Sequence, residues 1–422
     1  MLKKRSLALQ SELVRNGITL LSATTLSQAI ALIVYPIITR QYSPDDLGVL
    51  SLFLSIVGIG TILASGKYEL AIMVEKQKDG AAAAFDISFA ITILVSLLAL
   101  LLVLFFKPWL ISTFQLESIS EIMYLIPLLI FLSSIGFVLT YWFNRNKRFA
   151  LSARYNIVQS SVNSGLKVGL GSLGFTQWGL IAASITGQFF GVIAVLFKKK
   201  DFEKLFAFNS SLMKKVAQRQ IDFPKYTLPH SFINTLAGNL PIMILAVWFN
   251  MTEVGLFALS MTIGFKPITI FTGSVNQVLF QKIANNTANN IHSFDLVKKF
   301  CIKTMLIAGP IFLLLYFTLP SIVNFLFGEK WSISGEYLQL LLPWFFIALM
   351  SSSLCFMPAI AGKQRQAMYI EIVYALCRTA VLFIGVWQNS IIISILLYSI
   401  VNTLFVSGLL IWFLHLAKHT NR

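Results

Sequence analysis

Basic side chains inside otherwise apolar segments are the residues of this sequence whose chemistry is easiest to name. Lys266 and Arg378 each lie near the middle of a long apolar stretch, and Lys167 lies nearer the end of another. A cation in a membrane interior costs on the order of 3 kcal/mol, so its presence there indicates that it binds something. Ammonium and guanidinium groups pair most strongly with carboxylates and phosphates. These residues therefore predict a site for an anion.

Polar residues accompany these cations at helical spacing. Along 254–276, 151–172 and 367–388 they recur every three or four residues, so each set covers one face of a helix. The sets are Thr262, Lys266, Thr269, Gly273 and Asn276; Asn156, Ser160, Asn163 and Lys167; and Glu371, Tyr374 and Arg378. One interpretation is a hydrated, cationic cavity. The other is hydrogen bonding between neighbouring helices, which we favour for the individual serines and threonines.

Two further positions extend this candidate cavity. Pro267 follows Lys266 and removes a backbone donor, so it predicts a kink that acts as a hinge. Arg40 closes the first apolar stretch, either as a gate residue or as a simple boundary residue. Lys167 is open to two interpretations as well, because its long side chain could reach the membrane boundary. The candidate cavity residues are Lys266, Arg378, Lys167, Arg40, Asn163, Thr262, Thr269, Asn276 and Tyr374, with Pro267 as the hinge.

Patterns for covalent or metal chemistry do not occur in the sequence. The three cysteines form no CxxC pair, and the four histidines are scattered with no HExxH arrangement. We therefore expect no metal site, no cofactor and no disulfide framework. We also expect that the protein is not an enzyme, because the loops assigned to the outer face are short and poor in acids.

The elements that position these residues follow from composition. Of 422 residues, 57% are hydrophobic and 12% are charged, against about 25% charged in a soluble protein, and the mean hydropathy is +0.78. Because a membrane helix needs about 20 apolar residues, the sequence predicts an all-α polytopic membrane protein with twelve transmembrane helices. The predicted spans are 17–38, 47–68, 82–106, 121–143, 151–172, 178–197, 228–249, 254–276, 300–326, 335–360, 367–388 and 391–415.

Positive charge orients these spans. The 33 lysines and arginines outnumber the 17 acidic residues and concentrate on alternate loops, while the opposite face holds only Arg40, Lys107 and Lys330. By the positive-inside rule, both termini and the basic loops lie in the cytoplasm. The net charge of +16 is therefore interpreted as topogenic, and no nucleic-acid partner is expected.

An internal repeat divides the chain. Two six-helix lobes, 1–197 and 228–422, are joined by a cytoplasmic linker at 198–227. Residues 46–48 align with 253–255, and each begins a helix with an acidic residue, an aliphatic residue and a glycine. Because the first span of each half runs in the same direction, the lobes are parallel repeats around a central cavity. The linker is interpreted as a solvated segment, with an anionic-lipid or partner site as the alternative.

Four segments of the chain resemble the signatures of one known family. In chain order they are YSPDDLGVLSLFLSIVGIGTILASGKYELAIM, YWFNRNKRFALSARYNIVQSSVNSGLKVGLG, FPKYTLPHSFINTLAGNLPIMILAVWFNMTEVGLFALSMTIGFKPI and LFGEKW. They are similar to segments of the bacterial polysaccharide-biosynthesis flippases. These are the O-antigen and oligosaccharide repeat-unit translocases of the multidrug/oligosaccharidyl-lipid/polysaccharide exporter superfamily.

The resemblance implies two six-helix lobes that enclose a V-shaped cavity and alternate its access. It also implies transport of an undecaprenyl-pyrophosphate-linked oligosaccharide repeat unit from the cytoplasmic to the periplasmic leaflet of a bacterial inner membrane. That step serves O-antigen, and so lipopolysaccharide, or another surface polysaccharide. The implied partners are this lipid-linked substrate, a polysaccharide polymerase and a chain-length regulator. The family has no sharply defined catalytic motif, so the resemblance assigns no residue role.

Two other functions remain as alternatives. A cation-coupled drug or metabolite antiporter of the same superfamily needs a titratable acid in its cavity, and no aspartate or glutamate lies at mid-depth in the predicted spans. A membrane-embedded polymerase or glycosyltransferase needs a substantial outer loop with acids, bases or metal ligands. The sequence disfavours both.

Overall fold

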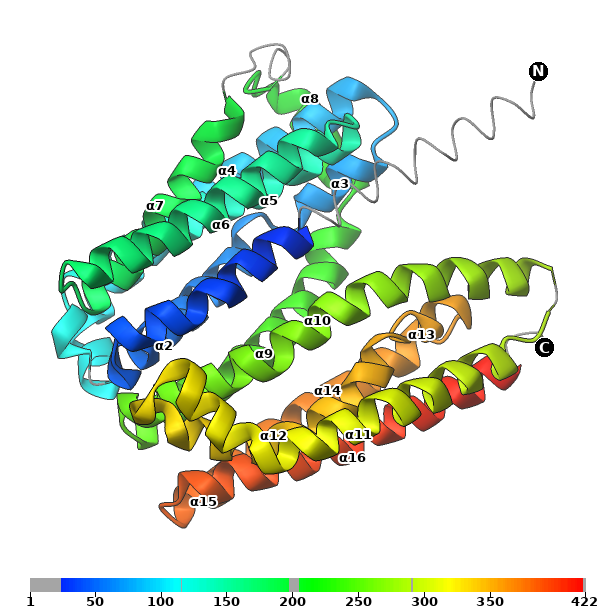
Figure 1. Cartoon of the computed structure of the whole chain (residues 1–422). Helices are drawn as coiled ribbons and strands as arrows, with labels where there is room; N and C mark the ends of the chain where they lie inside the picture. The colour runs from blue at the N-terminus through cyan, green and yellow to red at the C-terminus, as the bar shows by residue number, and fades with distance from the viewer. Residues whose placement is uncertain (1–23, 115, 197–204, 290, 420–422) are drawn as a thin grey trace. The chain divides into compact units, whose positions relative to one another are not determined.

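The computed structural model contains helices and no strands within the residues that it describes. Those residues are 24–114, 116–196, 205–289 and 291–419. They fall into two compact units (Figure 1). The first unit holds Val49–Asn239 together with the chain before Ser43, and the second holds Ser43–Gly48 together with Leu240–Arg422.

The first unit includes a helix of which residues 24–41 are described. Its further helices are α2 (Pro44–Ala64, beyond its first turn), α3 (Tyr68–Val74), α4 (Lys78–Phe114), α5 (Ile126–Arg145), α6 (Phe149–Ser172), α7 (Gln177–Leu196) and α8 (Ser210–Arg219). Helices α6 and α7 pack closely because α7 carries Gly187 and Gly191 one turn apart. A Cβ on Gly187 would press against Asn163, so small residues set this spacing, as is typical of membrane helices.

The second unit is built around α12. Its helices are the last part of α9 (Leu228–Trp248), α10 (Met251–Ala288), α11 (Phe294–Phe327), α12 (Ser332–Ser352), α13 (Met357–Ile360), α14 (Gln364–Ala380), α15 (Leu382–Trp387) and α16 (Ile391–His419). Helix α12 packs against α10, α11 and α16. Ser260 of α10 donates to the carbonyl oxygen of Ser334 (2.7 Å), and Ser334 donates back to that of Leu256 (3.0 Å). These buried serines join α10 and α12 by hydrogen bonds, the role that the packing interpretation gives to membrane hydroxyls.

Ten helical segments in the described part of the chain are long and apolar enough to cross a membrane. They correspond to ten of the twelve predicted spans. The predicted span 17–38 begins outside the described residues. The predicted span 151–172 coincides with α6, whose polar residues lower its hydropathy. Several helices are longer than predicted, and α10 continues to Ala288 where the prediction ends at residue 276, because helical hydrogen bonding continues through a polar segment.

The beginnings of α2 and α10 meet within the second unit and show the internal repeat directly. A Cβ on Gly48 would overlap the carbonyl oxygen of Met251, and a Cβ on Gly255 would overlap that of Pro44. The two contacts are reciprocal, because Gly48 aligns with Gly255 and Pro44 with Met251 in the repeat. Exchanged contacts of this kind define a local two-fold axis.

The N-terminal caps of α2 and α10, where these two helices meet, are also equivalent. The Ser43 hydroxyl donates to Asp46 (2.7 Å) and accepts from the Asp46 backbone N–H (3.2 Å). At the aligned position, Asn250 caps α10 by accepting from the backbone N–H of Glu253 (2.9 Å). Both caps satisfy donors that a helix N-terminus otherwise leaves free. The N-terminal signals predicted from residues 46–48 and 253–255 are therefore structural.

The segment 205–227 differs from the solvated linker that we expected. Helix α8 packs on α4, and its Val216 is fully buried. Glu75 accepts hydrogen bonds from the guanidinium group of Arg219 and from the side-chain amide of Gln220 (2.8 Å). The segment is therefore part of the first unit. Its packing could not be expected from charge spacing, because α8 is a helix of only ten residues with few apolar side chains.

Asp86 of α4 holds the stretch before α8. Its carboxylate accepts from the backbone N–H groups of Phe206 (2.8 Å) and Phe208 (3.1 Å). Both phenylalanines have positive φ angles, of 64° and 43°, a conformation that costs energy for a bulky residue and is retained when other contacts stabilise it. Asp86 is thus a buried anchor for the backbone before α8.

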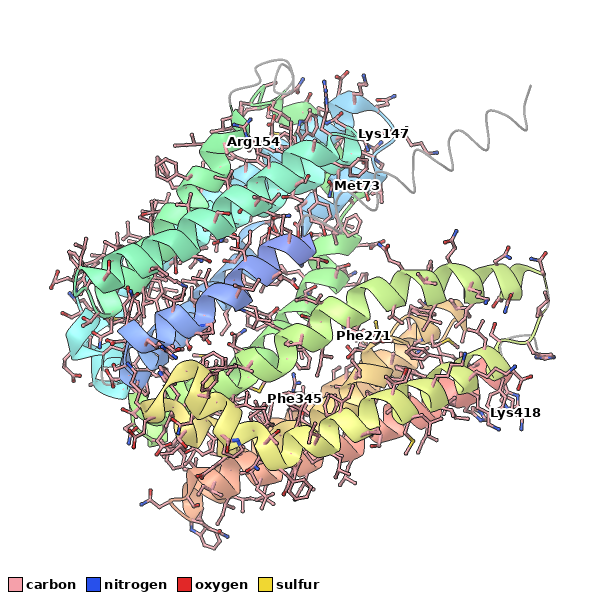
Figure 2. All side chains as sticks on the ribbon, viewed as in Figure 1. Met73, Lys147, Arg154, Phe271, Phe345 and Lys418 are labelled. Atoms are coloured by element: carbon pink, nitrogen blue, oxygen red, sulfur yellow. The ribbon has the colours of Figure 1, made fainter. Side chains whose placement is uncertain are left out.

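Reporter fusions test the predicted orientation of these helices. Fusions at Lys200 and Asn286 should report the cytoplasm, and fusions near Pro44 and Gly328 should report the periplasm, because basic loops stay inside. Lys147 and Arg154, two of the basic residues assigned to the cytoplasm, lie toward the same end of the first unit (Figure 2). A cytoplasmic signal at Pro44 would contradict the orientation.

Candidate functional site

Arg378 lies in a polar cluster inside the second unit, and we call the residues Tyr374, Arg378, Tyr398 and Asn402 the Arg378 cluster. The Arg378 guanidinium lies over the Tyr374 ring, 4.8 Å from its centroid. The Tyr374 hydroxyl donates to Asn402 Oδ1, and Asn402 Nδ2 donates to the carbonyl oxygen of Tyr398 (2.6 Å). The cluster thus joins two of the apolar helices, α14 and α16.

One donor of this cluster has no acceptor. Arg378 Nε is buried and makes no hydrogen bond to any described residue. A buried donor without a partner costs about 1–3 kcal/mol, and more when the group is charged. The cluster is otherwise well connected, since Tyr374 stacks on Phe405 with ring centroids 5.3 Å apart. An anionic ligand that accepts from Arg378 would remove this cost.

Lys266 is half-buried on α10 and is flanked by Phe265 and Pro267. The Phe265 ring stacks on Trp344 of α12 at 5.7 Å, and Trp344 meets Tyr398 edge to face at 5.7 Å. A continuous aromatic layer therefore runs from the neighbour of Lys266 to the Arg378 cluster. Pro267 lies inside α10, which continues through it.

Two other polar residues of the predicted α10 set, Thr269 and Asn276, have hydrogen-bond partners. The Thr269 hydroxyl donates to the carbonyl oxygen of Lys266, 2.8 Å away. Asn276 donates to the sulfur of Cys355, 3.3 Å away in the segment between α12 and α13. Thr262 is half-buried on the same helix. These contacts support the packing interpretation for the small polar residues and leave Lys266 as the group of α10 with the strongest case for binding an anion.

The candidates of the first unit lie on two helices. Asn163 and Lys167 are half-buried on α6, and Arg40 is exposed at the end of the first helix. The buried Asn163 Oδ1 has no hydrogen-bond partner among the described residues. Lys167 accepts the Tyr42 hydroxyl at its carbonyl oxygen (2.8 Å). The backbone of α6 at Lys167 therefore lies next to Tyr42, two residues after Arg40.

Sequence spacing therefore found part of this site. It paired Tyr374 with Arg378 correctly, since one helical turn separates them. It missed Tyr398 and Asn402, although their spacing of four residues within the predicted span 391–415 was a usable signal. No group of three or more metal-binding side chains occurs in the described part of the chain.

This fold, with its ten described helical segments long and apolar enough to cross a membrane, is that of a multi-pass membrane protein. The chain is similar to the lipid II flippase MurJ in an inward closed conformation, with a TM-score of 0.70, 15% identity, and coverage of 96% of this chain and 90% of that chain. It is also similar to an inward-facing multidrug resistance MATE family transporter of the MOP superfamily (TM-score 0.62, 13% identity, 96% and 98% coverage). A MATE transporter from Vibrio cholerae gives a TM-score of 0.55, 14% identity and 96% coverage of both chains.

These likenesses confirm the predicted fold of twelve helices in two lobes. A model of the polysaccharide biosynthesis protein family matches residues 37–335. The chain belongs to this family, as its four signature segments indicated. A search of the curated proteins finds no match.

Proposed function

We propose that this protein is a flippase for an undecaprenyl-pyrophosphate-linked oligosaccharide repeat unit. It would move that unit by alternating access from the cytoplasmic to the periplasmic leaflet of the bacterial inner membrane, with both termini in the cytoplasm. The product would feed a polysaccharide polymerase and a chain-length regulator in the synthesis of O-antigen or another surface polysaccharide.

The observation that carries the proposal is the half-buried cation Arg378, with its buried Nε, in a chain of the polysaccharide biosynthesis family. Its Nε has no partner within the described residues, and a pyrophosphate supplies several acceptor oxygens to such a donor. Tyr374 and the fully buried Asn402 are hydrogen-bonded to each other, so they position Arg378 rather than contact the substrate. A lipid II flippase shares this fold, so the fold accommodates lipid-linked cargo.

The buried carboxylates argue against the antiporter alternative. Within the described residues they are Asp46, Glu69, Glu75 and Asp86. Asp46 belongs to a helix cap, and Glu75 and Asp86 hold the segment around α8. A carboxylate that is engaged in this way is a poor carrier for a transported proton or sodium ion. Glu69 pairs with Lys67 through Oε1 (3.6 Å), and its buried Oε2 has no hydrogen-bond partner among the described residues, so only the other three carboxylates weigh against an antiporter.

Deleting the gene tests the proposal. We expect the lipid-linked repeat unit to accumulate in the cytoplasmic leaflet and the surface polymer to be lost, because the polymerase would receive no substrate. The measurement is extraction of lipid-linked sugars together with a gel of the surface polysaccharide. Complementation with the native gene is the control. Normal polymer in a deletion strain that lacks a second flippase would refute the proposed function.

A further inference from the structure

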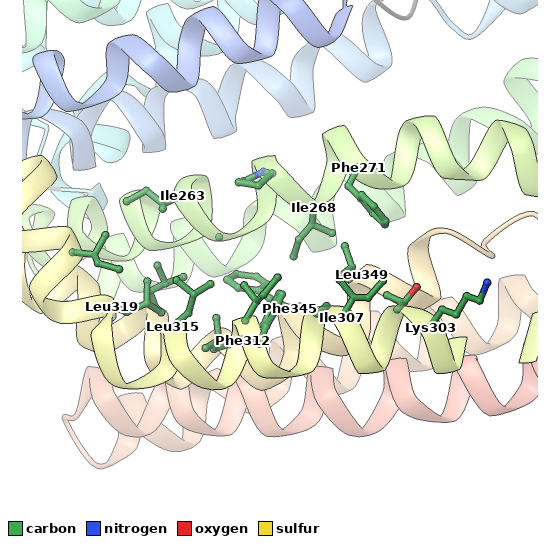
Figure 3. A pocket seen from close by; sticks show the side chains of 18 residues that line it. Ile263, Ile268, Phe271, Lys303, Ile307, Phe312, Leu315, Leu319, Phe345 and Leu349 are labelled. Atoms are coloured by element: carbon green, nitrogen blue, oxygen red, sulfur yellow. The ribbon is translucent and has the colours of Figure 1, made fainter. Parts of the chain in front are cut away.

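An apolar groove runs along the second unit between α10 and α11. These two helices both pack on α12 but do not pack closely on one another, so α12 forms the floor of the groove. Figure 3 shows Ile263, Ile268 and Phe271 of α10 facing the side chains of α11 across it. The groove has a volume of about 550 Å³, within the range of roughly 300–1,000 Å³ that small-molecule sites occupy.

The lining of the groove is apolar except at one end. Lys303 is its one charged lining residue, and Thr304 lies beside it on α11. Figure 3 shows Lys303 at one end of the groove and Leu319 near the other. In the orientation proposed above, Lys303 lies at the cytoplasmic end. A ligand that matches this pattern has an anionic head and a long apolar tail.

The length of the groove distinguishes between lipid tails. Its lining on α11 runs from Lys303 to Ile322, which is roughly 28 Å at 1.5 Å per residue. The whole hydrocarbon core of a bilayer is about 30 Å thick, so one leaflet supplies about half of that. A phospholipid tail with its head at Lys303 therefore fills only part of the groove. A chain that fills it must cross the bilayer midplane.

We propose that this groove binds the polyprenyl tail of the lipid-linked substrate, with the pyrophosphate head near Lys303. The inference rests on the proposed function, because it assumes that such a lipid reaches the protein in the cytoplasmic leaflet. Apolar burial alone gives no preference over bilayer lipid, since lipid tails are equally apolar. Selectivity comes from the length of the groove, from van der Waals packing on its branched side chains, and from charge at Lys303.

Filling the groove tests the proposal. Ile311 lines it and is 52% exposed, whereas Leu313, on the same helix and 63% exposed, does not line it. We expect Ile311→Trp to weaken the binding of undecaprenyl diphosphate roughly tenfold, because the indole occupies space that the tail needs. Leu313→Trp, the matched control, should leave the affinity unchanged. Native mass spectrometry of the purified full chain with added undecaprenyl diphosphate measures both.

A second pair of variants tests the head group and leaves the apolar lining of the groove unchanged. Lys303→Gln should also weaken binding roughly tenfold, because a charge-assisted hydrogen bond is lost. Lys299→Gln, one turn away on α11 and not part of the lining, should have no effect. Dioleoyl phosphatidylglycerol serves as the short-tailed anionic competitor and should bind with lower affinity than undecaprenyl diphosphate.

Three outcomes would overturn the proposal, and they differ in their meaning. Unchanged undecaprenyl diphosphate binding in Ile311→Trp would exclude the groove and leave the proposed function standing. Displacement of the phospholipid alone by Ile311→Trp would make the groove an ordinary lipid site. Absence of any undecaprenyl diphosphate binding to the native chain would contradict the proposed function itself.

Discussion

A strain whose only copy of this protein carries Lys266→Glu is expected to lose its surface polysaccharide while the protein still inserts in the membrane. Lys266 lies 15 residues after Met251, roughly 22 Å along α10, past the centre of a hydrocarbon core of about 30 Å. No acidic residue lies within one helical turn of it on α10. A glutamate there would place like charge against the pyrophosphate, so this variant should be the most damaging.

Milder substitutions at Lys266 separate charge from geometry. Lys266→Ala should lower transport by roughly tenfold to a hundredfold, because a charge-assisted hydrogen bond contributes about 1.5–3 kcal/mol. Lys266→Arg should retain part of the activity, since it keeps the charge and changes the shape of the donor. The measurement is complementation of the deletion strain, normalised to the amount of protein in the membrane.

A matched variant on the same helix supplies the control. Lys282 of α10 is exposed and lies in the part of the helix assigned to the cytoplasm, so Lys282→Glu should complement almost as well as the native gene. If Lys266 only joined neighbouring helices, all three of its variants would lower the amount of membrane protein together. Full activity of Lys266→Glu at a normal protein level would exclude a cationic cavity at this position.

The sequence predicted those parts of the molecule that depend on neighbours along the chain. Apolar length located the helices, and the aligned triplets at 46–48 and 253–255 marked equivalent helix starts. Helical spacing paired Tyr374 with Arg378. In each case the relevant contact lies within one or two turns, so the order of residues contains the necessary information.

The remaining features depend on contacts between residues far apart in the chain. Glu75 and Arg219 meet across more than a hundred residues, and nothing in their local spacing links them. The positive φ angles of Phe206 and Phe208 exist because Asp86 accepts their backbone N–H groups. The groove in the second unit exists because α10 and α11 both pack on α12 without packing closely on each other. The hydropathy of a sequence does not report the separation of two helices.

The crossing of α2 and α10 gives the second large expected effect. Gly48→Ala should destabilise the protein by about 1–3 kcal/mol or more, the usual cost of overpacking, because the added Cβ would overlap a backbone carbonyl that no side-chain rotation can move. Gly255→Ala should cost a similar amount, since its contact with Pro44 is the reciprocal one. Thermal unfolding of the detergent-solubilised protein measures both, as a lower melting temperature.

The local two-fold axis makes a sharper prediction for the double variant. Once Gly48→Ala has forced the two helix starts apart, the Cβ of Gly255→Ala meets less resistance, so the combined destabilisation should be smaller than the two single effects added together. Gly408→Ala is the control, because a Cβ there meets no atom within 4 Å, and replacing an interior helical glycine by alanine gains about 0.5–1 kcal/mol. Strict additivity of the two variants would show that the contacts are independent, and native stability of either single variant would show that the helix starts are not in close contact.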